Sequence, residues 1–94
     1  MDDIIAELKA IPLTVKLEQD INGVYGEIVE FPDEFEEEAT EDATIKELAK
    51  GLKGWAGILA AEYFSTIDVK QIPYILKALV STEQELEECL KKSM

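Results

Sequence analysis

The longest regular pattern of apolar and polar positions runs over residues 44–64. Apolar residues recur there at steps of three and four, the spacing of one buried face on an α-helix. These apolar positions are Ile45, Leu48, Ala49, Leu52, Trp55, Ala56, Leu59 and Tyr63. The lysines that fall on the opposite, solvated side are Lys46, Lys50 and Lys53. Thr44 and Glu47 have the spacing of a capping box, so the pattern predicts a long helix over about 44–64 that begins at Thr44.

Before this helix the period of the pattern changes to two, which is typical of a strand with one buried side. Alternating apolar residues predict a first strand over about 13–20, and a second strand follows over about 24–31. Asn22 and Gly23 lie between them and both tolerate positive φ, so they predict the turn of an antiparallel hairpin. The residues expected to point inward from the second strand are Tyr25, Val29 and Phe31.

Shorter patterns complete the fold. A third short strand is expected over about 35–40, leading into the long helix, and a short N-terminal helix over 2–10. After the long helix, Pro73 marks the first turn of a helix that ends near Ser81. A second capping box then opens a final helix over about 82–92.

Together these elements predict an α+β fold. A three-stranded antiparallel meander (about 13–20, 24–31 and 35–40) packs against one long helix (about 44–64), with a short N-terminal helix and a C-terminal helical pair. The 94 residues suit a single domain, 1–94, with a helical extension over 65–94.

The composition indicates a globular, intracellular protein. Hydrophobic residues make up 47% of the chain, and no apolar run approaches the length needed to span a bilayer. The single cysteine, Cys89, excludes an internal disulfide and suits a reducing cytoplasm. We therefore expect a cytoplasmic location.

The charge balance narrows the function. The chain has 21 acidic and 9 basic residues, for a net charge of −12, and all its basic residues are lysine. Such a field repels nucleic-acid phosphates and steers a basic partner towards the protein. Histidine, the commonest general base and metal ligand, is absent. We expect no enzymatic activity, no metal and no cofactor, and a basic protein as the partner.

Seven acids fall within ten residues and are the strongest candidate for the partner-binding site. They are Asp33, Glu34, Glu36, Glu37, Glu38, Glu41 and Asp42. A solvated loop or a charged edge strand that resists aggregation explains them equally well. A calcium loop is a third possibility, but the spacing lacks the alternating ligands and central glycine of an EF-hand.

A stripe of small residues follows the long helix between its apolar and lysine faces. The stripe consists of Gly51, Gly54, Gly57 and Ala61. Glycine inside a helix costs about 1 kcal/mol relative to alanine, so another segment is expected to approach the stripe closely. The C-terminal helices of the same chain are one candidate, and a helix of a second copy or of a partner is the other.

Over about residues 13–64 the chain resembles the HicB-like antitoxin family. The matching motifs are Gly23-Val24-Tyr25 at the turn, the step Glu30-Phe31-Pro32, and the opening of the helix at Asp42-Ala43-Thr44 with Glu47-Leu48. The resemblance implies a partial ribonuclease-H-like fold, a homodimer, and binding that masks a small basic RNA-cleaving toxin.

Three other functions remain open on the sequence. An acidic nucleic-acid mimic would inhibit a nucleic-acid-binding enzyme, and a stand-alone homo-oligomeric relative would have a diverged role. A metal-dependent hydrolase would need converging carboxylates, but the helix offers only Glu47 and Glu62, which lie more than three turns apart.

Overall fold

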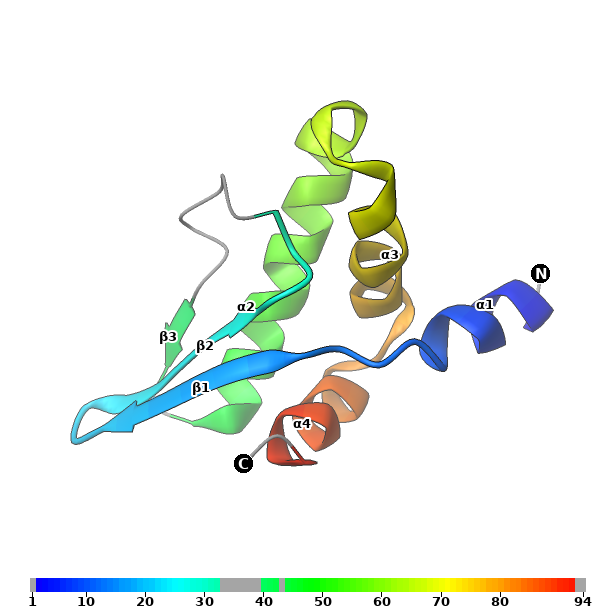
Figure 1. Cartoon of the computed structure of the whole chain (residues 1–94). Helices are drawn as coiled ribbons and strands as arrows, with labels where there is room; N and C mark the ends of the chain where they lie inside the picture. The colour runs from blue at the N-terminus through cyan, green and yellow to red at the C-terminus, as the bar shows by residue number, and fades with distance from the viewer. Residues whose placement is uncertain (1, 33–39, 43, 93–94) are drawn as a thin grey trace.

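The computed structural model describes residues 2–32, 40–42 and 44–92, and these form an α+β fold (Figure 1). The elements in chain order are α1 (Asp2–Lys9), β1 (Val15–Asp20), β2 (Gly23–Ile28), β3 (Thr40–Asp42), α2 (Ile45–Ile58), a π-helical turn η2 (Leu59–Tyr63), two 3₁₀ turns η3 (Phe64–Thr66) and η4 (Val69–Gln71), α3 (Ile72–Val80) and α4 (Glu83–Lys92).

The sheet is an antiparallel hairpin of β1 and β2, as predicted for the first two strands. The prediction of a three-stranded meander, with a short third strand over about 35–40, is wrong. β3 is a segment of 3 residues that pairs with β2, and most of the predicted third strand, residues 35–39, lies outside the described residues. The sequence of β3, Thr-Glu-Asp, has no apolar residue, so burial of an apolar face does not stabilise it as it stabilises the hairpin.

The hairpin also corrects the predicted inward residues of the second strand. Val24 and Ile28 are buried, whereas Tyr25 and Val29 are exposed. Phe31 is fully buried as predicted, but for a different reason. The strand ends at Ile28, and the N–H of Phe31 donates to the Ile28 carbonyl in a turn, so the alternation of the strand does not continue to Phe31.

The long helix is confirmed. Thr44 is its N-cap, and Thr44 Oγ1 accepts a hydrogen bond from the backbone N–H of Glu47 at 3.1 Å. With the turns η2 and η3, which follow α2 without a break, the helical segment is 22 residues long.

The buried face of α2 is narrower than predicted. Its buried residues are Leu48, Ala49, Leu52 and Ala56, and Leu59 of η2 continues this face. Trp55 is only half-buried and Tyr63 is exposed. Lys53 does not lie on a fully solvated side, because its Nζ donates to the carbonyl of Ser81, the C-cap of α3. Besides β2 and β3, α2 contacts α3 and α4, and Gly57 of the glycine stripe faces Leu79 of α3.

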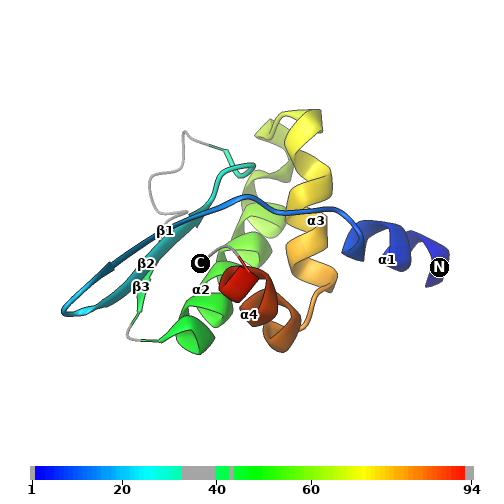
Figure 2. The ribbon, with the colours of Figure 1, turned by 60° about the horizontal axis from the view of Figure 1, so that its bottom comes forward.

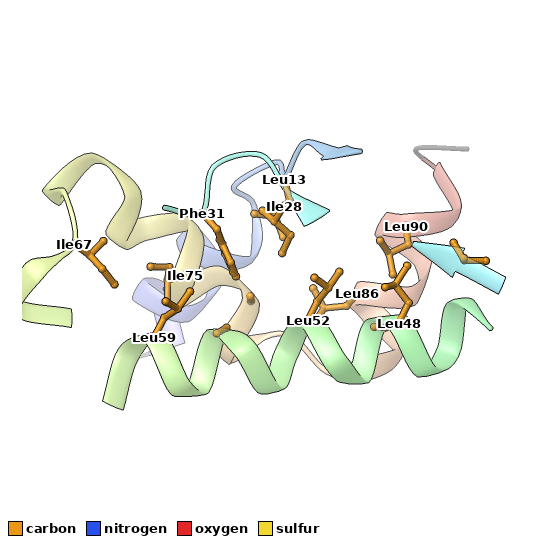
Figure 3. Close-up of a cluster of buried hydrophobic side chains, with 14 residues drawn as sticks. Leu13, Ile28, Phe31, Leu48, Leu52, Leu59, Ile67, Ile75, Leu86 and Leu90 are labelled. Carbon is orange, nitrogen blue, oxygen red and sulfur yellow. The ribbon is translucent and has the colours of Figure 1, made fainter. Parts of the chain in front are cut away.

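One hydrophobic cluster joins these elements (Figure 3). Leu13, Ile28 and Phe31 enter it from the hairpin side and face the buried side of α2. Ile75 of α3 and Leu90 of α4 close the cluster. The predicted C-terminal helical pair is confirmed, and both helices pack against α2 (Figure 2). Among the described residues, no helix has both the length and the apolar composition needed to cross a membrane.

The predicted N-terminal helix is also confirmed, and polar contacts fix its C-terminal end. Lys77 of α3 donates to the backbone carbonyl of Lys9, and Lys9 Nζ lies 3.3 Å from Glu85 Oε1 of α4. No residue of α1 is buried, and Ile4 is largely exposed. The helix therefore projects from the body of the molecule beyond α3 (Figure 1).

Candidate partner-binding surface

The open face of the hairpin is the side of β1 and β2 turned away from α2. Val24, Gly26 and Ile28 are buried, so strand alternation turns Tyr25 and Glu27 to the opposite face. Tyr25 keeps 41% of its surface exposed there. An exposed tyrosine on a sheet is suited to protein contact, because its ring buries a large apolar area and its hydroxyl can form a hydrogen bond.

Carboxylates surround Tyr25 on the open face. Glu18 is its cross-strand partner, and Glu27 follows it by two residues on the same strand. Lys16 Nζ lies 3.9 Å from Glu27 Oε1, but an ion pair this long with a largely exposed lysine contributes at most about 1 kcal/mol. Residues 15–30 contain four acids and one lysine, so the potential of the hairpin is negative.

The loop of the hairpin is fixed by Asp20. Its Oδ1 accepts hydrogen bonds from the backbone N–H of Asn22 at 2.7 Å and of Gly23 at 3.1 Å. Gly23 pairs with Asp20, so the loop residues are Ile21 and Asn22 and not the predicted Asn22 and Gly23. Gly23 has a φ of 153°, which is accessible mainly to glycine. The Asp20 carboxylate is therefore used to hold the turn.

The other end of the hairpin is held in a similar way. Glu30 Oε1 accepts a hydrogen bond from the backbone N–H of Thr14 at 2.8 Å. The N–H of Val29 donates to the carbonyl of Thr14, also at 2.8 Å. With both ends fixed, Glu18 and Glu27 are the carboxylates of the open face that do not hold the backbone.

The structure places part of the predicted acidic site beside this surface. Glu41 and Asp42 belong to β3, where Glu41 pairs with Tyr25 and Asp42 with Val24 in the backbone register. The other five acids lie outside the described residues, and they are Asp33, Glu34, Glu36, Glu37 and Glu38. The partner-binding role of the whole run stays a prediction.

The predicted glycine stripe divides between two environments. A Cβ on Gly57 would lie 3.9 Å from Leu79 of α3, so the C-terminal helices reach the stripe at this position. A Cβ on Gly54 would meet no atom of the described residues within 4 Å. Gly51 is half-exposed and Ala61 exposed. The fold of one copy therefore fills the stripe at Gly57 and leaves it open at Gly54.

The carboxylates that a metal-dependent hydrolase would need do not converge within the described residues. They contain no group of three or more histidine, cysteine or acidic side chains that could hold a metal ion. Glu47 and Glu62 are both exposed, at opposite ends of the long helical segment. A hollow between α2 and α4 has a volume of about 740 Å³, and the charged residues lining it are Lys46, Lys53, Lys91, Glu83, Glu87 and Glu88. Its lysines and glutamates balance, so it does not concentrate charge of either sign.

Comparisons of the chain with protein-family models, with curated proteins and with solved structures find no match.

Sequence reasoning missed the open face because it placed Tyr25 inside. A signal was present. The predicted two-residue loop Asn22-Gly23 would pair Leu17 with Ile28, and the observed loop pairs Leu17 with Gly26. Directly paired residues of an antiparallel hairpin share a face, so with Leu17 inward either register puts Gly26 and Ile28 inward and Tyr25 outward.

Proposed function

We propose that this protein is a non-catalytic binding protein that engages a basic protein through the open face of its hairpin. The observation that carries the proposal is the exposed ring of Tyr25 beside Glu18 and Glu27. A lysine or arginine of the partner can stack on the ring while its charge lies near a carboxylate.

The charge of the whole chain supports the same partner. A net charge of −12 steers a basic protein towards the surface and repels both nucleic acid and acidic proteins. The absence of histidine from the sequence and the open geometry around Tyr25 favour binding over catalysis.

In its specific form, the proposal is that the partner is a small basic RNA-cleaving toxin in the cytoplasm and that the protein acts as its antitoxin. The resemblance to the HicB-like family motivates this form. A surface that binds RNA phosphates must be cationic, so an acidic protein can mask it by occupying the same groups. The resemblance implies a three-stranded meander followed by a helix; the hairpin and the Thr44-capped helix agree with part of this order, whereas β3 has only 3 residues.

Purification of the protein from its source cells tests the proposal. We expect a small basic protein to co-purify, and we expect its RNA cleavage to stop when the two are mixed. Tyr25→Ala should weaken binding by about 30-fold or more, the effect of removing an interface anchor. A complex that contains no basic protein would contradict the proposal.

A charge-matched pair of variants separates the hairpin from the total charge. Glu18→Gln with Glu27→Gln removes two acids of the open face, and Glu62→Gln with Glu88→Gln removes two exposed acids elsewhere. The first pair should slow association and reduce its salt dependence, and the second should have a smaller effect. Equal effects of the two pairs on the association rate would show that association depends on the total charge of the protein and not on the open face.

Self-association is a second candidate function, favoured by the outer face of α2. Ile58 is 42% exposed and Gly54 is open, so a helix of a second copy could approach closely. Sedimentation measurements test this homodimer. A dimer that Ile58→Glu converts to a monomer would support it, and a wild-type protein that is monomeric at all concentrations would exclude it.

A further inference from the structure

β1 is an outer strand of the sheet. Among the described residues the strand order is β1-β2-β3, so β1 pairs on one side with β2. The register runs without a bulge from Val15, paired with Ile28, to Asp20, paired with Gly23. Proteins often prevent further pairing at such an edge with a bulge, a proline or charged side chains. β1 has no bulge and no proline, but it carries Lys16, Glu18 and Asp20.

Alternate backbone groups of β1 point away from β2. The N–H of Val29 donates to the carbonyl of Thr14. In an antiparallel pair, residues that bond to the neighbouring strand alternate with residues whose groups point to the other side. The even-numbered residues of β1 therefore direct their N–H and C=O groups towards β2, as Thr14 does. The residues whose N–H and C=O groups face the outer edge are Val15, Leu17 and Gln19.

Charge influences what can pair with this edge. Glu18 and Asp20 are exposed. In an antiparallel pair of two copies, the exposed Lys16 of one copy could lie opposite Glu18 of the other, so the charges of β1 alone do not exclude self-pairing. Two copies that each carry a net charge of −12 nevertheless repel one another, whereas a lysine- or arginine-rich segment is attracted. The charge of the molecule therefore favours a basic strand over a second copy at this edge.

We propose that β1 receives an extended, basic segment of the partner protein as an additional strand of the sheet. This inference rests on the proposed function and specifies how the partner binds. Backbone hydrogen bonds to Val15, Leu17 and Gln19 supply affinity, and basic side chains of the added strand lie beside Glu18 on the open face. The added strand thereby extends the surface that contains Tyr25.

The first experiment uses a defined probe, an acetylated octapeptide of alternating lysine and valine. Its control is the same peptide N-methylated at alternate amides, which keeps the charge but cannot donate along one edge. With the unmethylated peptide, hydrogen exchange at the amides of Val15, Leu17 and Gln19 should slow about tenfold or more. Binding of both peptides with equal affinity and no slowing would overturn the proposal, because charge alone would then explain it. Slow exchange at these amides without any peptide would mean that a second copy pairs with β1, which also overturns it.

The second experiment uses the protein that co-purifies from source cells and two variants at one position. Gln19→Pro removes an outward N–H and blocks the edge, and proline is tolerated on an edge strand at such a position. Gln19→Ala keeps the N–H. We expect Gln19→Pro to weaken binding at least about tenfold while Gln19→Ala binds as the wild type does. Circular dichroism and thermal unfolding verify that both variants fold.

The outcomes separate this inference from the function on which it rests. If Gln19→Pro binds the basic protein normally while Tyr25→Ala loses it, the proposed function stands and strand addition is wrong. If no basic protein binds the wild type, the proposed function itself fails.

Discussion

Gly26 sets how closely α2 approaches the hairpin. A Cβ at this position would lie 2.9 Å from Leu17 Cδ2 and 3.0 Å from Leu48 Cδ2. Both distances are shorter than ordinary van der Waals contacts. Leu17 is half-buried and can rotate, but Leu48 is fully buried within the core. A glycine here therefore lets Leu48 pack directly on the strand backbone.

Gly26→Ala should lower the free energy of unfolding by about 1–3 kcal/mol, because an added methyl group overpacks this contact. Chemical denaturation of the variant and the wild type measures the difference. A variant as stable as the wild type would show that Leu48 shifts without cost.

Gly54→Ala is the matched control, and its effect should have the opposite sign. Gly54 lies inside α2 without a positive φ, and a Cβ there meets no described atom within 4 Å. Alanine should raise the free energy of unfolding by about 0.5–1 kcal/mol, since it restricts the unfolded chain and adds no clash. A loss of stability would indicate a close neighbour at Gly54, such as a second copy.

Among the elements, those defined by local contacts were predicted well from the sequence. The second capping box is complete: Thr82 N donates to Glu85 Oε1 and Glu85 N donates to Thr82 Oγ1, each at 3.1 Å. Such a box needs only residues three positions apart, so its signal is contained in the sequence. The same holds for the Thr44 cap of α2 and for Pro73 in the first turn of α3.

The predictions that failed depend on which face a strand buries and on where an element ends. Val24 and Ile28 are buried, so alternation places Val29 with Tyr25 on the exposed face, the opposite of the prediction. Phe31 is buried because a turn begins after Ile28, where strand alternation was still assumed. In the same way, the π-helical turn η2 adds a residue to the helical repeat, so the face predicted for α2 does not continue to Tyr63. Periodicity defines a face only while the repeat is unbroken.

The start of α4 makes stability depend on pH through Glu85. The hydrogen bond from the backbone of Thr82 lowers the pKa of Glu85 below its ordinary value of 4.5, and Lys9 adds to the effect. A lowered folded-state pKa means that the carboxylate stabilises the fold above pH 4.5 and loses this contribution as the pH falls through the folded-state pKa.

Glu85→Gln should therefore be less stable than the wild type at neutral pH, and the difference should shrink in acid. The free energy of unfolding, measured at neutral pH and at acidic pH, tests this prediction. The control is Glu83→Gln in the same helical turn. A difference that stays constant with pH would contradict the assignment.

For the whole molecule, the contacts least visible in the sequence are those between distant segments. Lys77 and the carbonyl of Lys9 are separated by 68 residues. Nothing in the local pattern around either lysine indicates this contact, because it depends on how α1 and α3 pack. The position of the candidate site is likewise absent from the local sequence pattern, since it depends on which side of the hairpin α2 covers.

The net charge of −12 should destabilise the compact state through self-repulsion. Raising the ionic strength from about 0.01 M to about 0.15 M shortens the Debye length to roughly 8 Å and screens this repulsion. We expect the free energy of unfolding to rise by about 1 kcal/mol, equivalent to roughly 4–8 °C in melting temperature for a chain of this size. A melting temperature that falls with salt would mean that attractive ion pairs outweigh the repulsion.

The exposed position of α1 has a consequence for the order of folding. The helix has 8 residues, none of them buried, and is too short to persist alone. Its contact with α3 closes a loop that spans most of the chain, so it gains stability only after that loop has formed. We expect Lys77→Met to accelerate unfolding while leaving the folding rate unchanged, which stopped-flow measurements can determine. Of the described elements, the one that comes first in the sequence would then be the last to reach its native place.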